Sequence, residues 1–224
     1  MTVTRRMFLP LAATGLLATS QVLAQAMPDA TFPQGHGDMP LRDALAKRES
    51  IRLYTEAAVE EEQLLALLRS ANGVNRADVD GRTAPSWRTA KDTEIYVARA
   101  SGVDRYDAPA GKLVPVSTDD IRKVTSTQPF VGTAPSVLIY VSERSRVLKA
   151  AGLDEQALEK ETEDHRIAAH VNAAVIAQNV YLFCAAEGLG TCLVGGADRA
   201  AITAALGLSD GQRVTYVQPV GHPA

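Results

Sequence analysis

The sequence predicts an α+β fold, in which helices cover a mostly antiparallel mixed sheet around one central buried helix. Residues 167–186 form a twenty-residue run without a charge that is apolar on nearly every side, and such a run is typical of a buried helix. Short strand-like segments lie far apart in the sequence, separated by helical ones, which favours the α+β class. The 224 residues suffice for one domain with a sizeable core.

The N-terminus has the pattern of an export signal. Arg5 and Arg6 precede a mildly apolar run to about Val22, and Ala24-Gln25-Ala26 supplies the small residues of a cleavage site. The paired arginines followed by Phe-Leu resemble a twin-arginine signal. We therefore expect residues 1–26 to be a signal peptide and the mature protein to be periplasmic. The alternative is an uncleaved N-terminal membrane anchor.

An arm and two helices are predicted at the start of the mature chain. Residues 27–39 are rich in Pro and Gly and predict an extended arm, so the folded domain is expected to span residues 40–224. A short amphipathic helix is predicted from Pro40 to about Lys47. A second helix is predicted over 59–71, where leucines recur at helical spacing before Asn72-Gly73.

A long polar loop is predicted next, over residues 74–93, and loops of that length are often functional. Residues 94–98 alternate like a strand, and residues 111–116 are its expected hairpin partner across the sequence GVDRYDAPA. Residues 118–127 are expected to form a short helix capped by Ser117 or Thr118.

The C-terminal half is expected to hold most of the core. The sequence SVLIYV at 136–141 predicts a strand of the buried type. Residues 143–163 predict one or two charged amphipathic helices, broken at Gly152. After the central helix, residues 200–206 predict a helix closed by Gly207, and residues 214–220 predict the last strand.

The apolar run is long enough to span a membrane, but four polar side chains within it would be costly in lipid: those of His170, Asn172, Gln178 and Asn179. We interpret the run as the core helix of a soluble domain. The glycines of EGLGTCLVGG, which follow it, end the helix and leave backbone amides available to a ligand.

Composition and motif content count against several function classes. A net charge of −3 gives no electrostatic reason to expect a nucleic-acid partner. His165 and His170 are five positions apart, which does not place them on one helix face. Neither a metal-binding motif nor a nucleophile elbow is present in the sequence. We expect no metal and name no catalytic side chain.

Cys184 and Cys192 are the two cysteines, and an exported protein meets an oxidising compartment in which they could form a disulfide. Because Cys is among the most buried residue types, a buried free thiol at Cys184 is the simpler interpretation. A thiol-redox function that uses this pair is the least favoured hypothesis.

Arg48, Ser50 and Arg52 alternate in the sequence, so their side chains point the same way in an extended segment. Two guanidinium groups and a hydroxyl that converge on one point suit a phosphate. An exposed strand with ordinary surface arginines explains the same pattern equally well.

Three motifs together resemble the nitroreductase-like FMN flavoprotein family. They are Arg48-x-Ser50-x-Arg52, then Ala84-Pro85-Ser86, then QNVYLFCAAEGLGTCLVGG with PVGHP near the end. Their order and spacing match from about Leu41 to Pro223. The sequence NRADVDGRTAPS, with GVDRYD, resembles most closely the branch that contains the thiazole- and oxazole-forming dehydrogenases.

The resemblance implies a homodimer with FMN at the subunit interface. By matching positions, Arg48, Ser50 and Arg52 would hold the phosphate and ribityl chain, and Ala84, Pro85 and Ser86 would line the isoalloxazine from the other subunit. Further positions would pack on the ring or offer it amides: Leu193, Val194, Gly195 and Gly196. Asn172 matches a position where the family often has an amide near the flavin, although a buried Asn needs hydrogen-bond partners in any case.

The resemblance also implies an FMN-dependent oxidoreductase, which passes hydride or electrons through flavin N5 to or from a small conjugated substrate. NAD(P)H is the family's usual donor, and a periplasmic electron-donor protein is the alternative for an exported member. Two departures stand out: TAKDTE replaces the Asn and Gln-Pro-Trp of many relatives, and no basic residues follow Gly221-His222. These departures favour a second hypothesis, a non-enzymatic exported ligand- or flavin-binding protein.

Overall fold

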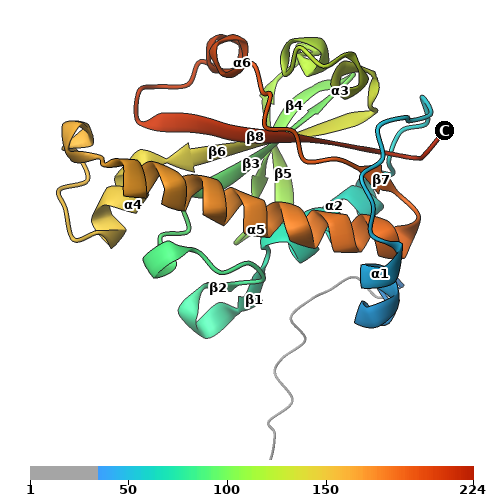
Figure 1. Ribbon diagram of the computed structural model, residues 1–224, viewed down its shortest axis with the longest axis horizontal. Coiled ribbons are helices and arrows are strands. Elements are labelled where there is room, and N and C mark those ends of the chain that lie inside the picture. The colour runs from blue at the N-terminus through green and yellow to red at the C-terminus, as the bar shows by residue number, and fades with distance from the viewer. Residues whose placement is uncertain (1–34) are drawn as a thin grey trace, which may run out of the picture.

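The computed structural model describes residues 35–224, so the predicted signal at residues 1–26 and most of the predicted arm lie outside the described residues. The fold is α+β, as the sequence predicts, with an antiparallel sheet between two layers of helices (Figure 1). The long helix α5 (Glu163–Glu187) and α2 (Glu61–Asn72) pack on one face. The short helices α3 (Pro129–Thr133) and α6 (Arg199–Leu206) lie on the other.

The main sheet has six strands in the order β5-β4-β3-β6-β8-β7. Every recorded pairing in it is antiparallel. The strands are β3 (Thr93–Arg99), β4 (Gly102–Asp107), β5 (Lys112–Ser117), β6 (Ser136–Glu143), β7 (Gly190–Thr191) and β8 (Gln212–Gly221). Two short strands, β1 (Val74–Arg76) and β2 (Gly81–Arg82), form a separate pair inside the region predicted as a polar loop.

Strand β6 explains why the sequence SVLIYV shows no alternation. Leu138 and Tyr140 face the core cluster of α2 and α5, whereas Val137 and Ile139 face the cluster of α3 and α6. Because both faces of the sheet are covered, every position of the strand except its last is buried. The prediction of a buried strand is confirmed, and the strand extends two residues further than predicted.

The predicted hairpin of 94–98 with 111–116 is wrong, because GVDRYD is itself a strand. Strand β4 pairs with β3 through a tight turn at Ala100-Ser101, and β5 pairs with β4 instead of β3. Gly102 has φ +130° at the end of this turn, a conformation that favours glycine. Two cross-strand ion pairs support the true register, Arg99–Asp104 at 2.5 Å and Arg105–Glu94 at 3.1 Å.

One of the next two helix predictions is wrong, and the other is confirmed by a single helix that ends before Gly152. Residues 118–127 hold only a 3₁₀ turn at Arg122–Val124, since β5 extends to Ser117 and the side chain of Asp120 accepts the backbone N–H of Arg122, which closes a turn. Residues 143–163 hold α4 (Arg144–Ala150) and a 3₁₀ turn at Leu158–Lys160. Helix α1 (Leu41–Lys47), α2, α6 and β8 lie where the sequence predicts them, within two residues at each end.

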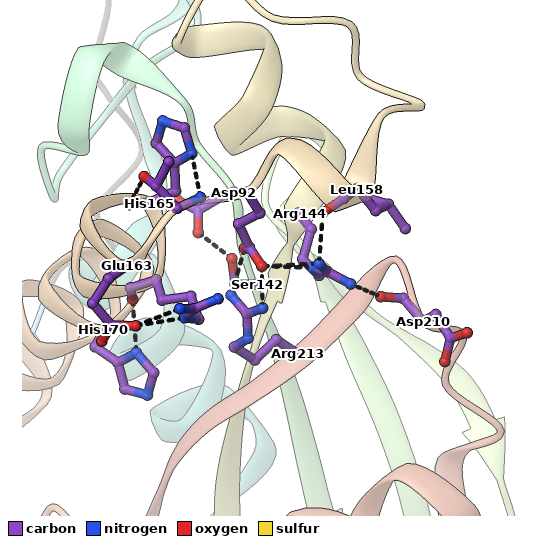
Figure 2. Close-up of polar contacts among 12 residues, drawn as sticks. Asp92, Ser142, Arg144, Leu158, Glu163, His165, His170, Asp210 and Arg213 are labelled. Atoms are coloured by element: carbon purple, nitrogen blue, oxygen red, sulfur yellow. Dashed lines mark hydrogen bonds and ion pairs between the residues drawn. The ribbon is translucent and has the colours of Figure 1, made fainter.

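Helix α5 begins at Glu163, four residues before the predicted apolar run, because a capping box starts it. The Thr162 hydroxyl accepts the N–H of His165, and His165 Nδ1 accepts the N–H of Thr162. Gly188, with φ +70°, ends the helix in the left-handed conformation. Figure 2 shows His165 near the start of the helix.

Among the described residues, α5 is the one helix that is long and apolar enough to cross a membrane, judged by length and composition alone. Half of its most apolar stretch is buried inside the protein. Its polar side chains serve tertiary contacts, since Asn179 Nδ2 donates to the carbonyl of Ala71 in α2 at 3.1 Å. The outward face remains open in the single chain. Ile167 and Val171, one turn apart, are 51% and 52% exposed, so the expectation of burial on all sides holds only for the sheet-facing side.

The last residues of the predicted arm fold back on the C-terminal end of α5. Glu187 accepts hydrogen bonds from the backbone N–H of Gly37 at 2.6 Å and from Gln63 Nε2 at 3.2 Å. His36 Nδ1 lies 2.8 Å from the same carboxylate. One carboxylate therefore joins the arm, α2 and α5.

A second carboxylate joins the opposite end of the domain. Glu161 is almost fully buried and pairs with Arg144 at 2.9 Å and with Arg213 of β8. Arg144 also donates to the carbonyls of Leu158 and Asp210, as Figure 2 shows. Burial alone would raise the pKa of Glu161, but its hydrogen bonds to the two guanidinium groups outweigh this effect and lower the pKa. This pairing holds the connection between α4 and α5 against β8.

Candidate functional site

The segment that carries Arg48, Ser50 and Arg52 is extended and runs beside β7. The N–H of Ile51 donates to the carbonyl of Thr191 at 2.9 Å. A Cβ on Gly190 would lie 2.8 Å from Ile51 Cγ2, so this close approach requires glycine. Residues 48–53 belong to no helix or strand, and of the three side chains predicted to converge only those of Arg48 and Ser50 meet, at Tyr181.

Tyr181, on α5, is the contact point of this segment. Its hydroxyl lies 2.9 Å from Ser50 Oγ and accepts the backbone N–H of Leu193 at 2.8 Å. Arg48 places its guanidinium carbon 5.5 Å from the centre of the Tyr181 ring, within the range of a cation–π contact. The structure therefore brings Arg48, Ser50 and Leu193 together around one phenol. The sequence prediction missed Tyr181. Its only signal in the sequence is a hydroxyl-bearing side chain within a largely apolar run.

Arg52 lies apart from that group and points toward Phe130 of α3, with 6.0 Å between its guanidinium carbon and the ring centre. Among residues 35–224, neither Arg48 nor Arg52 lies within ion-pair distance of a carboxylate. Arg52 is exposed and Arg48 is partly so. Both charges remain open to an anion from outside the chain.

The segment of residues 193–196 offers fewer amides than its glycines suggest. The N–H of Leu193 is taken by Tyr181, and Val194 exchanges both backbone hydrogen bonds with Val217 of β8. Gly195 and Gly196 are exposed, and their N–H groups have no acceptor within residues 35–224. Only these two amides are left for a ligand.

Gly195 also leaves space beside it. A Cβ placed there would meet nothing closer than Tyr216 Cε1, at 4.0 Å. Tyr216 in turn makes an edge contact with the ring of His170, with 5.3 Å between the ring centres. Tyr216 therefore lies between Gly195 and His170 of α5.

Asn172 holds the other sequence-predicted segment, Ala84-Pro85-Ser86. Its Oδ1 accepts the backbone N–H of Trp87 at 2.7 Å, and its Nδ2 donates to Asp92 Oδ1 at 2.6 Å. Ser86 Oγ accepts the N–H of Lys91 at 2.9 Å. Both polar atoms of Asn172 are used within the chain, so the geometry assigns it a structural task.

Asp92 completes this network and is fully buried. Its second carboxylate oxygen accepts the hydroxyl of Ser142 at 2.5 Å, a contact that Figure 2 shows. Burial raises the pKa of Asp92, and the hydrogen bonds from Ser142 and Asn172 oppose the rise without cancelling it. No sequence motif pointed to this carboxylate.

Backbone strain gathers next to Ala84-Pro85-Ser86, in residues 88–91. Arg88, Thr89 and Lys91 all have φ between +46° and +57°, a left-handed conformation that is uncommon for residues other than glycine. Arg88 places its guanidinium carbon 4.9 Å from the ring centre of Trp87. Such strain is typical of functional segments held by their surroundings.

The predicted site residues form two separate groups in one chain. Arg48, Ser50 and Leu193 gather at Tyr181, and Ala84-Pro85-Ser86 lies at Asn172. The positions 172 and 181 are nine residues apart on α5, about 13 Å at 1.5 Å per residue. A single chain does not bring the two groups into contact.

The two cysteines are buried and free. Cys184 belongs to the core cluster on the α5 side of the sheet and Cys192 to the cluster on the opposite side. Burial raises the pKa of the Cys184 thiol far above its usual range. The structure agrees with the buried-thiol interpretation and shows no disulfide. Within residues 35–224, no group of three His, Cys, Asp or Glu side chains is placed to hold a metal ion.

The family model that describes the nitroreductase family matches residues 45–222. The chain belongs to the nitroreductase family. A protein of Methanocaldococcus jannaschii, provisionally named a nitroreductase, is 29% identical over 169 residues, 70% of this chain and 79% of that protein.

Solved structures agree with this assignment. A provisionally named nitroreductase of Ralstonia eutropha is 32% identical, with a TM-score of 0.75 over 83% of this chain and 84% of that one. An NADPH:FMN oxidoreductase of Vibrio harveyi, in complex with NAD⁺, shares the fold at 18% identity, with a TM-score of 0.58 over 82% of this chain and 68% of that one. Neither is named as a thiazole- or oxazole-forming dehydrogenase, so that finer placement stays a prediction.

Proposed function

We propose that this chain is an FMN-dependent oxidoreductase that passes hydride or electrons to or from a small conjugated substrate. The proposal rests on two kinds of group without a partner among residues 35–224. The guanidinium groups of Arg48 and Arg52 have no carboxylate nearby, and the N–H groups of Gly195 and Gly196 have no acceptor. Arg48 and Leu193, which begins the glycine segment, both contact Tyr181, whereas Arg52 lies apart at Phe130, in a nitroreductase-family domain. Cations and free amides suit a ligand that is an anion at one end and a hydrogen-bond acceptor at the other.

The residues present fit FMN. Arg48 and Arg52 would hold the phosphate, and Ser50 would hold the ribityl chain, its hydroxyl oriented by Tyr181. Gly195 and Gly196 would offer their N–H groups to the acceptor edge of the ring, while the side chains of Leu193 and Val194 support the segment from below. Glycine at position 195 leaves the backbone open to a flat ligand.

The bound flavin supplies hydride or single-electron transfer at N5, and this chain's residues bind and tune it. The N–H groups of Gly195 and Gly196 would lie at the pyrimidine edge of a bound flavin, where they would stabilise the negative charge that the ring gains on reduction. Arg48 and Arg52 add positive charge at the phosphate end. NAD(P)H is the proposed donor, and a periplasmic electron-donor protein is the alternative for an exported enzyme.

A second copy of the chain completes the proposed site. Ala84-Pro85-Ser86 is remote from Tyr181 within one chain, and Pro85 is exposed. The apolar face of α5 is open, with Ile167 and Val171 half exposed, and His170 beside them contacts Tyr216, which lies near Gly195. Pairing two such faces would bury this surface and would bring the Pro85 segment of one chain to the glycine segment of the other.

A non-enzymatic flavin- or ligand-binding protein is the second candidate. The specific observation in its favour is the strained segment Arg88–Lys91, which stands where many relatives carry Gln-Pro-Trp. Flavin that binds but accepts no electrons from NADH, NADPH or a photochemically reduced mediator protein would favour this candidate.

The test compares FMN with riboflavin, which lacks the phosphate. The mature chain should bind FMN at least about tenfold more tightly, the scale of one or two charge-assisted hydrogen bonds. Replacement of both Arg48 and Arg52 by Gln should remove that preference and leave riboflavin binding unchanged. The control is Arg42→Gln, at an exposed arginine whose one recorded ion pair among residues 35–224 is with Asp43. A colourless protein that gains no FMN on reconstitution contradicts the proposal.

Export is proposed from the Arg5-Arg6 signal alone. Replacement of both arginines by Lys should leave the protein in the cytoplasm, since the twin-arginine pathway reads that pair. Cell fractionation with an antibody to the mature chain measures the outcome, and an unchanged periplasmic fraction would count against the route.

A further inference from the structure

A second cleft, separate from the proposed flavin site, lies between the loop of residues 80–91, the start of β3, β4 and α4. It has a volume of about 460 Å³, within the range of small-molecule sites. Neither Arg48, Tyr181 nor the segment of residues 193–196 lines it. A small cavity that shares Arg82 and Thr93 with it extends toward Ala84-Pro85-Ser86.

Positive charge is in excess in this cleft. Asp80 is shared by Arg82 at 3.3 Å and Lys91 at 3.1 Å. Glu94 is shared by Arg105 at 3.1 Å and Arg146 at 2.7 Å. Four cationic side chains therefore share two carboxylates as ion-pair partners. The remaining charges of the lining, Lys149 and Asp107, offset each other.

Three buried polar atoms of the lining have no hydrogen-bond partner in the part of the chain that the structure describes: Thr93 Oγ1, Arg82 Nε and Tyr106 Oη. Thr93 is 6% exposed, and its Oγ1 is unpartnered. Arg82 Nε is buried and makes no recorded hydrogen bond, although it lies 3.3 Å from Asp80 Oδ1 as an ion pair. Buried polar atoms without partners are uncommon and costly. A hydroxyl and a guanidinium N–H that lack an acceptor are the donor set for an oxyanion.

The rest of the wall is less polar. Ile95, Ala108 and Pro109 line the side formed by β3 and the β4–β5 turn. Inorganic phosphate has no apolar part to pack against such a wall, whereas an organic acid has one. We propose that this cleft binds a small organic carboxylate with an apolar body, whose oxygens accept hydrogen bonds from Arg82 Nε and Thr93 Oγ1.

The probe is benzoate, with benzamide as its neutral match, titrated into the purified mature chain with and without added FMN. Backbone amide NMR should show saturable shifts at residues 91–95 and 105–109 with benzoate and not with benzamide. The same shifts should appear in the presence of FMN, because the two sites share no lining residue. Absence of saturable shifts with benzoate overturns the proposal, as does a response confined to residues 48–52 and 193–196.

Thr93→Val is the decisive variant, because it removes the unpartnered hydroxyl and keeps the shape of the side chain. Its melting temperature should stay the same or rise, while benzoate affinity should fall about threefold to tenfold, the scale of one hydrogen bond. Arg82→Gln should weaken benzoate by at least about tenfold. Thr55→Val removes another buried unpartnered hydroxyl, outside the cleft, and should leave binding unchanged.

Benzoate affinity that is equal in wild type and Thr93→Val contradicts the assignment of the donor. Inorganic phosphate is the second probe. If it binds more tightly than benzoate at the same residues, the carboxylate assignment is wrong. Neither result depends on flavin binding, so this proposal and the proposed function fail separately.

Discussion

Asn172 Oδ1 accepts the backbone N–H of Trp87 at 2.7 Å, and this bond ties the central helix to the strained loop that follows Ala84-Pro85-Ser86. The same amide donates to the buried carboxylate of Asp92. One side chain thus fixes the position of a segment that the proposed function assigns to the partner's flavin. Any change of Asn172 should act on stability first and on flavin only through that loop.

Asn172→Ala should destabilise the domain by about 2–6 kcal/mol, because it leaves Asp92 Oδ1 and the Trp87 N–H without their hydrogen bonds, at about 1–3 kcal/mol per buried group, although Ser142 still donates to Asp92 Oδ2. Urea unfolding measures the loss. Asn179→Ala is the control, since it removes one hydrogen bond from the same helix, to Ala71, and should cost about 1 kcal/mol. Equal losses for the two variants would show that the Asn172 network contributes nothing special.

The buried carboxylate of Asp92 should make stability fall as pH rises. Burial raises its folded-state pKa above the unfolded value, which is about 4. The folded state then holds the proton more tightly, so this contribution to stability is present below pH 4 and is lost as pH rises through the folded pKa.

Asp92→Asn removes that dependence while keeping the hydrogen bonds, since its oxygen accepts from Asn172 and its amide donates to Ser142. The stability of the variant relative to wild type should therefore increase with pH above about 4. Urea midpoints from pH 4 to 8 test this, with the exposed Asp78→Asn as control. A difference that decreases with pH would falsify the assignment.

Much of the fold follows from the sequence because it rests on local pattern. The charge-free run and its glycines predict α5, and the continuous apolar run of β6 predicts a strand buried on both faces. Strand β4 was missed because Asp104 and Arg105 read as loop residues, whereas their charges are matched across the sheet by Arg99 and Glu94. Cross-strand pairing depends on register, which one segment alone does not reveal.

The candidate site, like the fold, could be predicted from the sequence only in part. The alternation of Arg48, Ser50 and Arg52 is visible in the sequence, but Tyr181 lies 131 positions after Ser50 and no spacing connects them. The amides of Leu193 and Val194 were expected to face a ligand and instead bond to Tyr181 and Val217. Asn172 and Asp92, 80 positions apart, meet only because α5 packs across the loop. Contacts of this kind need the tertiary structure.

Glu187 should give stability that is lost in acid. Burial alone would raise its pKa, but hydrogen bonds from His36, the Gly37 N–H and Gln63 outweigh this and lower it. The folded pKa lies below the unfolded value of about 4.3, so the contribution is present above pH 4.3 and disappears as pH falls through the folded pKa.

Glu187→Gln should therefore lose its stability deficit relative to wild type as pH falls below about 4. At neutral pH it should also release the arm, so limited proteolysis should cut near Gly37 faster than in wild type. Glu155→Gln, whose partner Lys149 is 3.8 Å away and exposed, is the matched control. An arm cut equally fast in both variants would disprove the anchoring role.

Gly195→Ala separates folding from flavin binding. The new methyl group would meet only Tyr216, at 4.0 Å, so the melting temperature of the flavin-free protein should be unchanged. The methyl group projects where the proposed ring lies, and FMN affinity should fall about tenfold or more, as expected for overpacking that costs about 1–3 kcal/mol. Gly211→Ala, with a similarly open neighbourhood away from the site, should bind FMN normally. Unchanged FMN binding in Gly195→Ala would contradict the proposed position of the flavin ring beside Gly195.

Val171→Asp tests the proposed pairing of two chains through α5. Val171 is 52% exposed in the single chain and lies one turn from Ile167, so a carboxylate there is solvated in the monomer and its folding should be little affected. In a dimer built on this face the same carboxylate would be buried without a partner, a loss of several kcal/mol for the two symmetric copies.

Light scattering after size exclusion should show a dimer for wild type and a monomer for the variant. FMN binding should be lost in parallel, because Ala84-Pro85-Ser86 no longer reaches the second chain. Leu53→Asp, at a position 72% exposed outside α5, should remain dimeric. A Val171→Asp protein that stays dimeric would place the interface on another face, and one that is monomeric yet binds FMN normally would show that a single chain holds the cofactor.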